Sequence, residues 1–158
     1  MRWGCLSLVI PFCTPVCALA AGHDYPALGH IPGYHITDYS ERSFDSASFE
    51  PEPGQKVSVN GHKISIEYFA DDNANHASFM EIYLNYLSVL NALKADIIHK
   101  PADMNADKQS LLARFYRNGS PVYVDIQAVR WNSDGEKYSL LIVEQKDFQP
   151  SIVTSPAQ

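Results

Sequence analysis

The sequence lacks cysteine after position 17. Its three cysteines, Cys5, Cys13 and Cys17, all lie within the first 20 residues, so residues 21–158 contain no thiol. This excludes disulfide bonds, thiol nucleophiles and cysteine-type zinc sites from that part of the chain. A folded domain there must be stabilised by its hydrophobic core, for which about 140 residues suffice.

Positive charge is scarce as well. The full chain has 12 basic and 18 acidic side chains. Residues 21–158, which do not include Arg2, keep 11 basic and all 18 acidic side chains, a balance of −7. The basic residues are scattered and form no stripe or tail. This argues against binding to nucleic acid or to anionic lipid, both of which need clustered Lys and Arg.

Several catalytic motifs are also missing. The sequence contains no Gly-x-Ser-x-Gly elbow and no glycine-rich phosphate loop. Paired carboxylates for glycoside cleavage cannot be selected from eighteen acidic residues without a pocket. The sequence thus points to no catalytic residue and to no cofactor.

The first 20 residues have the pattern of a secretory signal peptide. Arg2 precedes an apolar stretch that ends in Ala18-Leu19-Ala20, which predicts cleavage after Ala20. Pro11 and Pro15 interrupt this stretch, and it is too short to span a bilayer as a permanent helix. We therefore expect a periplasmic or secreted mature chain without stable membrane insertion. A buried N-terminal strand and a lipid anchor at Cys13 or Cys17 are the less favoured alternatives.

Alternating apolar residues predict β-hairpins in the mature chain. Three dipeptides that suit tight turns separate the alternating segments: Asn60-Gly61, Asn118-Gly119 and Asp134-Gly135. Residues 138–143 are apolar on both faces, so this strand is predicted to be central. Residues 34–39, 44–49 and 95–100 are further predicted strands.

One segment is predicted to be helical. Ser78 and Glu81 form a capping-box sequence. Six apolar and aromatic residues then follow at helical spacing on one face: Phe79, Ile82, Tyr83, Tyr86, Leu90 and Leu93. We predict an α+β fold in which an antiparallel sheet of about six to eight strands packs one face against a main helix over residues 78–94. The domain spans residues 21–148, and residues 149–158 form a flexible tail.

Three histidines lie near the predicted mature N-terminus. His23, His30 and His35 could bind zinc or copper, but their spacing matches no ligand pattern that we recognise, so ordinary loop histidines are favoured. Residues 71–75 are rich in oxygen ligands yet lack the central glycine of a calcium loop, so a solvated loop is favoured.

Tyr123, Asp125 and Gln127 alternate with core positions of a predicted strand. They are therefore expected on the outer face of the sheet, where they form our candidate binding surface. Asn118-Gly119-Ser120 matches an N-glycosylation acceptor, but the hairpin turn explains it equally well.

Short motifs spread over residues 24–146 suggest a family resemblance. They are Asp24-Tyr25-Pro26, Gly33-Tyr34, Phe44-Asp45, Ser78 to Glu81, Asn85-Tyr86 and Val143-Glu144. In these motifs the chain resembles a periplasmic domain of unknown function that precedes an OmpA-like peptidoglycan-binding domain in many Gram-negative envelope proteins. The OmpA-like domain itself is absent from this sequence, and the resemblance implies no catalytic residue.

These features predict a non-enzymatic periplasmic or envelope-associated domain that binds an envelope protein. Two alternatives stay open. One is a small secreted hydrolase with a carboxylate or histidine site, which predicts a deep pocket with shifted pKa values. The other is a secreted effector or inhibitor in bacterial competition or host contact, which predicts protein in the culture medium.

Overall fold

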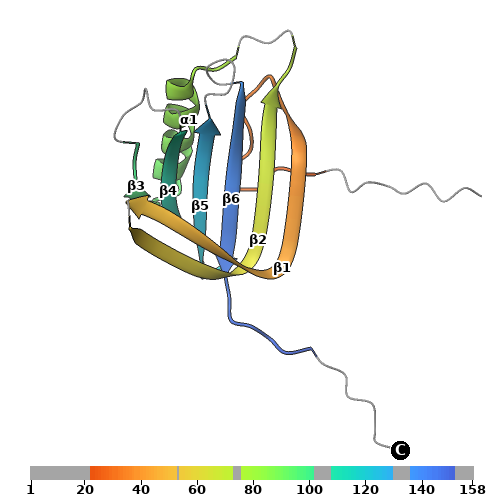
Figure 1. The fold of residues 1–158 in the computed structure, drawn as a ribbon, viewed down its shortest axis with the longest axis vertical. Coiled ribbons are helices and arrows are strands. Elements are labelled where there is room, and N and C mark those ends of the chain that lie inside the picture. The colour runs from red at the N-terminus through yellow and green to blue at the C-terminus, as the bar shows by residue number, and fades with distance from the viewer. Residues whose placement is uncertain (1–21, 53, 73–75, 102–107, 130–135, 152–158) are drawn as a thin grey trace, which may run out of the picture.

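The computed structural model describes residues 22–52, 54–72, 76–101, 108–129 and 136–151 (Figure 1). The predicted signal peptide and the Asp134-Gly135 dipeptide lie outside these residues. The elements are β1 (Tyr34–Glu52), β2 (Gln55–Ala70), α1 (Phe79–Ala92), β3 (Asp96–His99), β4 (Lys108–Arg117), β5 (Ser120–Val129) and β6 (Lys137–Gln145).

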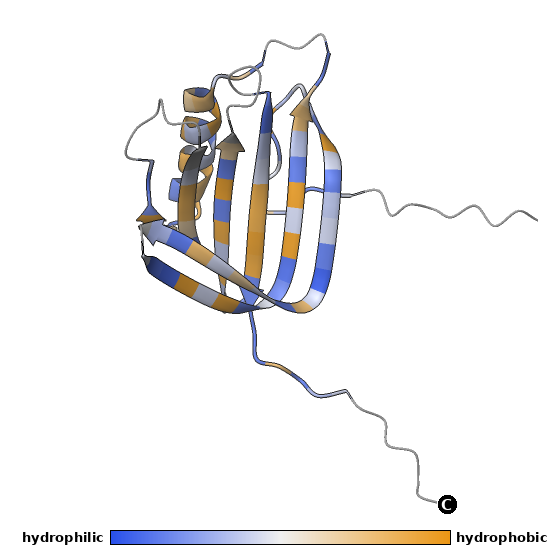
Figure 2. Ribbon diagram, in the orientation of Figure 1, coloured by the Kyte–Doolittle hydropathy of each residue, from blue (hydrophilic) through white to orange (hydrophobic). Residues whose placement is uncertain are grey.

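The six strands form one antiparallel sheet in the order β1-β2-β6-β5-β4-β3, and α1 covers one face of it beside β4 and β5 (Figure 1). The described part of the chain is therefore mainly β with a single helix, in broad agreement with the α+β prediction. As predicted, β6 is central, since it lies between β2 and β5. Figure 2 shows hydrophobic residues along most of β6, whereas the edge strand β1 is largely polar.

The main core lies between α1 and the sheet. The helix contributes Phe79, Ile82, Tyr86 and Leu90 to it, so the apolar stripe of the helix is core, as predicted. The predicted capping box is also present: the Glu81 amide donates to Ser78 Oγ at 3.2 Å, and the Ser78 amide donates to Glu81 Oε2 at 2.6 Å. The described part of the chain contains no helix long and apolar enough to cross a membrane.

The C-terminal end of β1 and the N-terminal end of β2 form an arm. This arm bends across the face of the sheet opposite α1 (Figure 1). We define the arm as residues 46–51 and 54–59. It buries Ala47, Phe49 and Val59 against Leu112 and Val143 in a second, smaller core. A register shift between Arg42 and Asp45 lies where β1 enters the arm, and such irregularities bend strands.

The predicted turn at Asn60-Gly61 is wrong, because both residues lie inside β2. A Cβ atom on Gly61 would come within 2.0 Å of the Glu144 carbonyl oxygen, so glycine here permits the close approach of β6. The chain turns instead between Glu52 and Gln55, where Gly54 has φ +83°. Segments predicted as four strands are therefore two long ones, and the described sheet has six strands, the lower end of the predicted range of six to eight.

The Asn118-Gly119 turn is confirmed. Both residues have positive φ, 51° and 84°, as a tight hairpin between β4 and β5 requires. The predicted strand at residues 95–100 is β3.

An N-terminal segment, residues 22–33, packs on the sheet on the same side as α1. Tyr25 and Leu28 are buried there. The segment is fixed by its polar groups as well: the Ile31 amide donates to the Tyr138 hydroxyl at 3.1 Å, and the Tyr86 hydroxyl donates to the Gly29 carbonyl at 3.1 Å. This segment forms one wall of the candidate site.

Candidate functional site

A cavity of about 160 Å³ lies where the N-terminal segment crosses the ends of the sheet strands. We call it the cleft. Its lining comprises His23, Tyr25, Pro26, Tyr39, Glu41, His62, Ile64, Arg117 and Glu144. The cleft thus combines two phenol rings, two imidazoles, two carboxylates and a guanidinium in one hollow.

Strand alternation explains why three of these polar residues meet. On the face toward α1, β2 presents Tyr68, Ile66 and Ile64, β6 presents Tyr138, Leu140 and Ile142, and β4 presents Leu111, Ala113 and Phe115, all of them in the main core. The next residue on this face in each strand is polar, namely His62, Glu144 and Arg117. His62 and Glu144 are direct cross-strand partners. The cleft therefore begins where three apolar rows end.

Glu144 is the centre of the cleft. Its Oε1 accepts hydrogen bonds from the Tyr25 hydroxyl at 2.7 Å and from Arg117 Nη1 at 2.9 Å. Its Oε2 lies 3.2 Å from His62 Nδ1. The Arg117 guanidinium also lies over the Tyr25 ring, 5.3 Å from its centroid, which adds a cation–π contact.

A second chain of contacts runs from His62 toward the N-terminus. His62 Nε2 lies 2.7 Å from Glu41 Oε1, and the Tyr39 hydroxyl donates to Glu41 Oε2 at 2.8 Å. The Tyr39 oxygen is 3.5 Å from His23 Nε2. Because both ring nitrogens of His62 face carboxylates, a protonated imidazole can donate to both of them.

The shifts in pKa stabilise the charged or neutral form that each group already has at neutral pH. Partial burial raises the pKa of Glu144, but hydrogen bonds from Tyr25, His62 and Arg117 outweigh this and lower it overall. Tyr39 and His62 lower the pKa of Glu41. Burial and the nearby carboxylates raise the pKa of Tyr25 and of Tyr39 to about 12 each.

A neighbouring hollow of about 240 Å³ extends the site beyond Arg117 and Glu144, which line both cavities. The other residues that line it are Asn118, Ser120, Val122, Gln145 and Lys146. Together the two hollows offer amide, hydroxyl, ammonium and carboxylate groups around a central ion pair, a set suited to a polar ligand or to polar side chains of a partner.

The structure separates the three histidines predicted as weak metal candidates. His23 lines the cleft, His30 Nδ1 lies 2.6 Å from Asp24 Oδ2, and His35 Nδ1 lies 2.6 Å from Asp71 Oδ1. No group of three or more His, Cys, Asp or Glu side chains that could hold a metal ion occurs among the described residues. Asp71 belongs to the segment considered as a calcium loop, of which residues 73–75 lie outside the described part.

Tyr123, Asp125 and Gln127 share the face of β5 opposite α1, but they do not form one exposed surface. The arm covers Tyr123, whose ring stacks on that of Phe49 with centroids 6.2 Å apart. Asp125 is only 6% exposed, and it accepts hydrogen bonds from Ser110 Oγ and from Gln127 Nε2. Burial raises the pKa of Asp125. Of the three predicted residues only Gln127 is exposed.

His62, Arg117 and Glu144 were not identified as site residues from the sequence. Each is the polar residue that ends an apolar row, and this pattern could have placed them on the inner face of the sheet. The bond between Tyr25 and Glu144, both in motifs of the family resemblance, was missed as well.

No protein-family model matches the chain, and no curated protein matches it. The resemblance to the envelope domain therefore stays a prediction from short motifs.

Proposed function

We propose that the chain is exported, is cleaved after Ala20, and acts in the periplasm or at the cell envelope as a non-enzymatic domain that binds an envelope protein through the cleft. The sequence supports export by the signal-peptide pattern of residues 1–20. The cleft supports binding because it gathers paired charged groups in one hollow.

The observation that carries the proposal is the mutual pairing of the charged groups in the cleft. Glu144 has partners on both carboxylate oxygens, and so has Glu41. A general acid or base works best when its pKa lies near the operating pH. Here the carboxyl pKa values are lowered and the tyrosine pKa values are raised, away from neutrality. Such groups present fixed charges and hydrogen-bonding atoms, which suits recognition.

The hydrolase alternative fits the described residues less well. Burial raises the pKa of Asp125, as a general acid requires. It lies in the face covered by the arm, and Ser110 and Gln127 occupy its oxygens. A substrate would have to displace these partners to reach the carboxyl group.

Site-specific photo-crosslinking in living cells tests the proposal. A photoreactive residue is placed at Gln145, in the hollow beside Glu144, and in a matched protein at Lys56, which is exposed on the arm. We expect one recurrent envelope protein to be captured from position 145 and not from position 56. Equal capture from both positions, or none from position 145, would contradict the proposal.

Substitutions then identify the surface. The double substitution Gln145→Ala with Lys146→Ala removes two exposed side chains of the hollow beside the cleft. Gln127→Ala, the comparison, removes the exposed side chain on the face of β5 opposite α1. Capture should be lost only in the first protein. Loss only in the second would place the partner on the β5 surface instead. Fractionation completes the test, since accumulation in the culture medium would favour the secreted effector.

A further inference from the structure

Cleavage after Ala20 would create a new amino terminus with the sequence Ala21-Gly22-His23. A histidine in third place gives one terminus four nitrogen ligands: the α-amino nitrogen, the amide nitrogens of the second and third residues, and the imidazole Nδ1. When these four nitrogens bind one metal ion, they lie in a plane around it, and each pair of nitrogens that are neighbours along the chain forms a chelate ring with the ion. Four nitrogens in a square plane are the preferred environment of Cu²⁺, and next of Ni²⁺.

We propose that the mature chain binds one Cu²⁺ ion at this amino terminus, with the imidazole of His23, which lines the cleft, as one ligand. The inference rests on the export and the cleavage site of the proposed function. It is independent of whether an envelope protein binds in the cleft.

The orientation of His23 supports the proposal. Its side chain is exposed, and its Nε2 faces the Tyr39 hydroxyl at 3.5 Å, with the ring centroids 5.1 Å apart. Within the described part of the chain no hydrogen bond engages Nδ1, the ring nitrogen nearer to the backbone of the same residue. The nitrogen that must bind the metal is thus available, and the other one is held by a neighbour, as is usual for metal-ligating histidines.

The backbone meets the second requirement. Binding needs the amide nitrogens of Gly22 and His23, and neither donates a hydrogen bond to any of the described residues. Proline has no amide hydrogen and would prevent such ligation at either position. The first proline after the cleavage site is Pro26, outside the ligand set.

Gly22 also lies close to the cleft. A Cβ atom at position 22 would lie 2.6 Å from Tyr39 Cβ, so the backbone of Gly22 packs directly on this side chain. Tyr39 in turn donates to Glu41. Gly22 and His23, which supply three of the four proposed ligand atoms, therefore lie beside a phenol that is bonded to a carboxylate of the cleft.

The proton balance makes binding depend on pH. Each Cu²⁺ ion displaces one proton from the terminal ammonium group and one from each of the two amides, and these three protons pass to the buffer. No electron is transferred. Affinity should therefore rise with pH. Zn²⁺ prefers tetrahedral sites and does not favour this planar set, so it should compete poorly.

The experiment uses mature protein isolated from cells that export the full chain, with its first residue determined by mass spectrometry. CuCl₂ is titrated into it and followed by electron paramagnetic resonance and by calorimetry. The matched control is the same chain with one methionine before Ala21, which leaves every side chain in place but moves His23 to fourth position. His23→Ala, His30→Ala and His35→Ala complete the set.

We expect one copper ion per chain with a four-nitrogen signal, and affinity lower by a factor on the order of 100 or more in the methionine-extended chain and in His23→Ala, because planar nitrogen ligands are lost. The His30 and His35 variants should bind normally. Equal binding by the extended chain would overturn the proposal. A native chain that begins at another residue would overturn the cleavage site together with it, whereas a chain that begins at Ala21 and binds no copper would overturn the copper site alone.

Discussion

At the scale of single residues, the position of Glu144 explains why the cleft is ordered. Its side chain is 27% exposed, and its carboxylate meets groups from β2, β4 and the N-terminal segment. Hydrogen bonds to a charged group are worth about 1.5–3 kcal/mol when one partner is removed, and less where solvent reaches the pair. Glu144 should therefore contribute to stability as well as to recognition.

Glu144→Gln should lower the free energy of unfolding by about 1–2 kcal/mol at neutral pH, because the charge opposite Arg117 is lost. The folded-state pKa of Glu144 lies below its ordinary value of 4.5, so its contribution is complete above that pH and disappears as pH falls through the folded-state pKa. Urea unfolding at several pH values measures the difference between the two proteins, which should shrink in acid. Asp147→Asn, on an exposed residue nearby, is the control. A difference that persists in acid would contradict the role of the charge.

A pair of substitutions distinguishes a strand from a turn at residues 60 and 61. Gly61→Ala should destabilise the protein by about 2–3 kcal/mol or more, because the new Cβ meets the Glu144 carbonyl. Asn60→Ala, on an exposed side chain of the same strand, should change stability by less than about 0.5 kcal/mol. Thermal and urea unfolding measure both. If the two substitutions are equally costly, the Asn-Gly turn that the sequence suggested is present after all.

The residues of the cleft could be predicted only in part. His62 and Arg117 each continue an alternation that the sequence shows, so extending each apolar row by one step would have placed them on the inner face. The contact between Tyr25 and Glu144 joins residues 119 positions apart. It depends on the strand order, which no local pattern contains.

At the scale of elements, local sequence signals predicted the structure correctly where no tertiary contact opposed them, and incorrectly where one did. The capping box needs only Ser78 and Glu81, three residues apart, so the start of α1 was predictable. The Asn60-Gly61 dipeptide suits a turn, but β6 pairs alongside it and keeps the strand straight enough to continue. The arm was not predictable, because bending over the sheet depends on the residues that it covers.

Ser78→Ala should lower stability by about 1 kcal/mol, since the first turn of α1 loses its capping acceptor. Ser88→Ala makes the same change on an exposed position inside the helix, where alanine is the better helix former. It should leave stability unchanged or raise it slightly. Circular dichroism during thermal unfolding measures both. A cap without effect would show that packing on the sheet alone fixes the start of α1.

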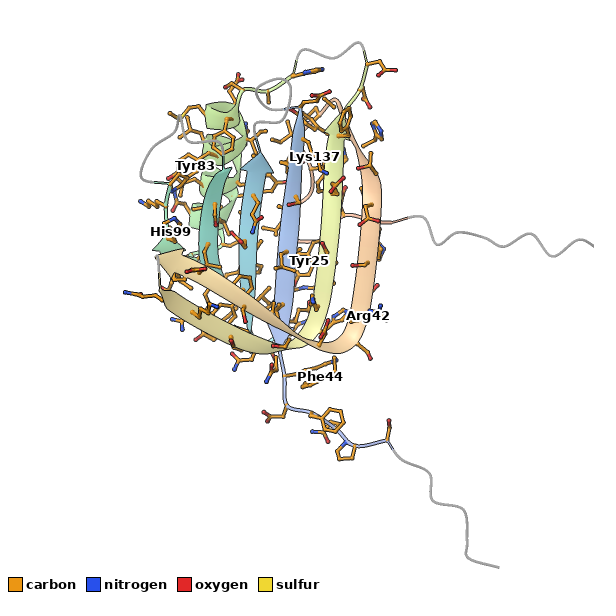
Figure 3. All side chains as sticks on the ribbon, in the orientation of Figure 1. Tyr25, Arg42, Phe44, Tyr83, His99 and Lys137 are labelled. Carbon is orange, nitrogen blue, oxygen red and sulfur yellow. The ribbon has the colours of Figure 1, made fainter. Side chains whose placement is uncertain are left out.

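Phe49→Ala tests the arm. Phe49 is 2% exposed, and truncation of a buried phenylalanine costs about 3–5 kcal/mol. Phe148→Ala is the matched control: Phe148 is 63% exposed and contacts the ring of Phe44, labelled in Figure 3, at 5.2 Å between centroids. Its loss should cost less than about 1 kcal/mol. Urea unfolding measures the two proteins side by side. Similar small effects would mean that the arm packs only loosely on the sheet.

At the scale of the whole molecule, β6 connects two parts of the sheet. It pairs with β2 on one side and with β5 on the other, so without it the hairpin of β1 and β2 would not be joined to β5, β4 and β3 in the sheet. It also carries Tyr138 and Glu144, to which the N-terminal segment binds. The two halves of the fold therefore depend on the last strand.

A chain that ends at residue 130, before β6, should not fold. We expect no cooperative unfolding transition in urea and rapid digestion by a protease, because Tyr25, Ile66 and Val124 would lose the strand that buries them. The mature chain with β6 is the comparison. A cooperative transition in the shortened chain would show that β3, β4, β5 and α1 form a stable unit without it.

This strand order has a consequence for the timing of folding. A ribosome makes Tyr25 119 positions before Glu144 of β6, the residue to which Tyr25 binds in the folded chain. Contacts of such long range form slowly, and here they cannot form until β6 has left the ribosome. Core residues that pack against β6, such as Ile66 of β2 and Val124 of β5, therefore stay uncovered on the growing chain until that strand follows.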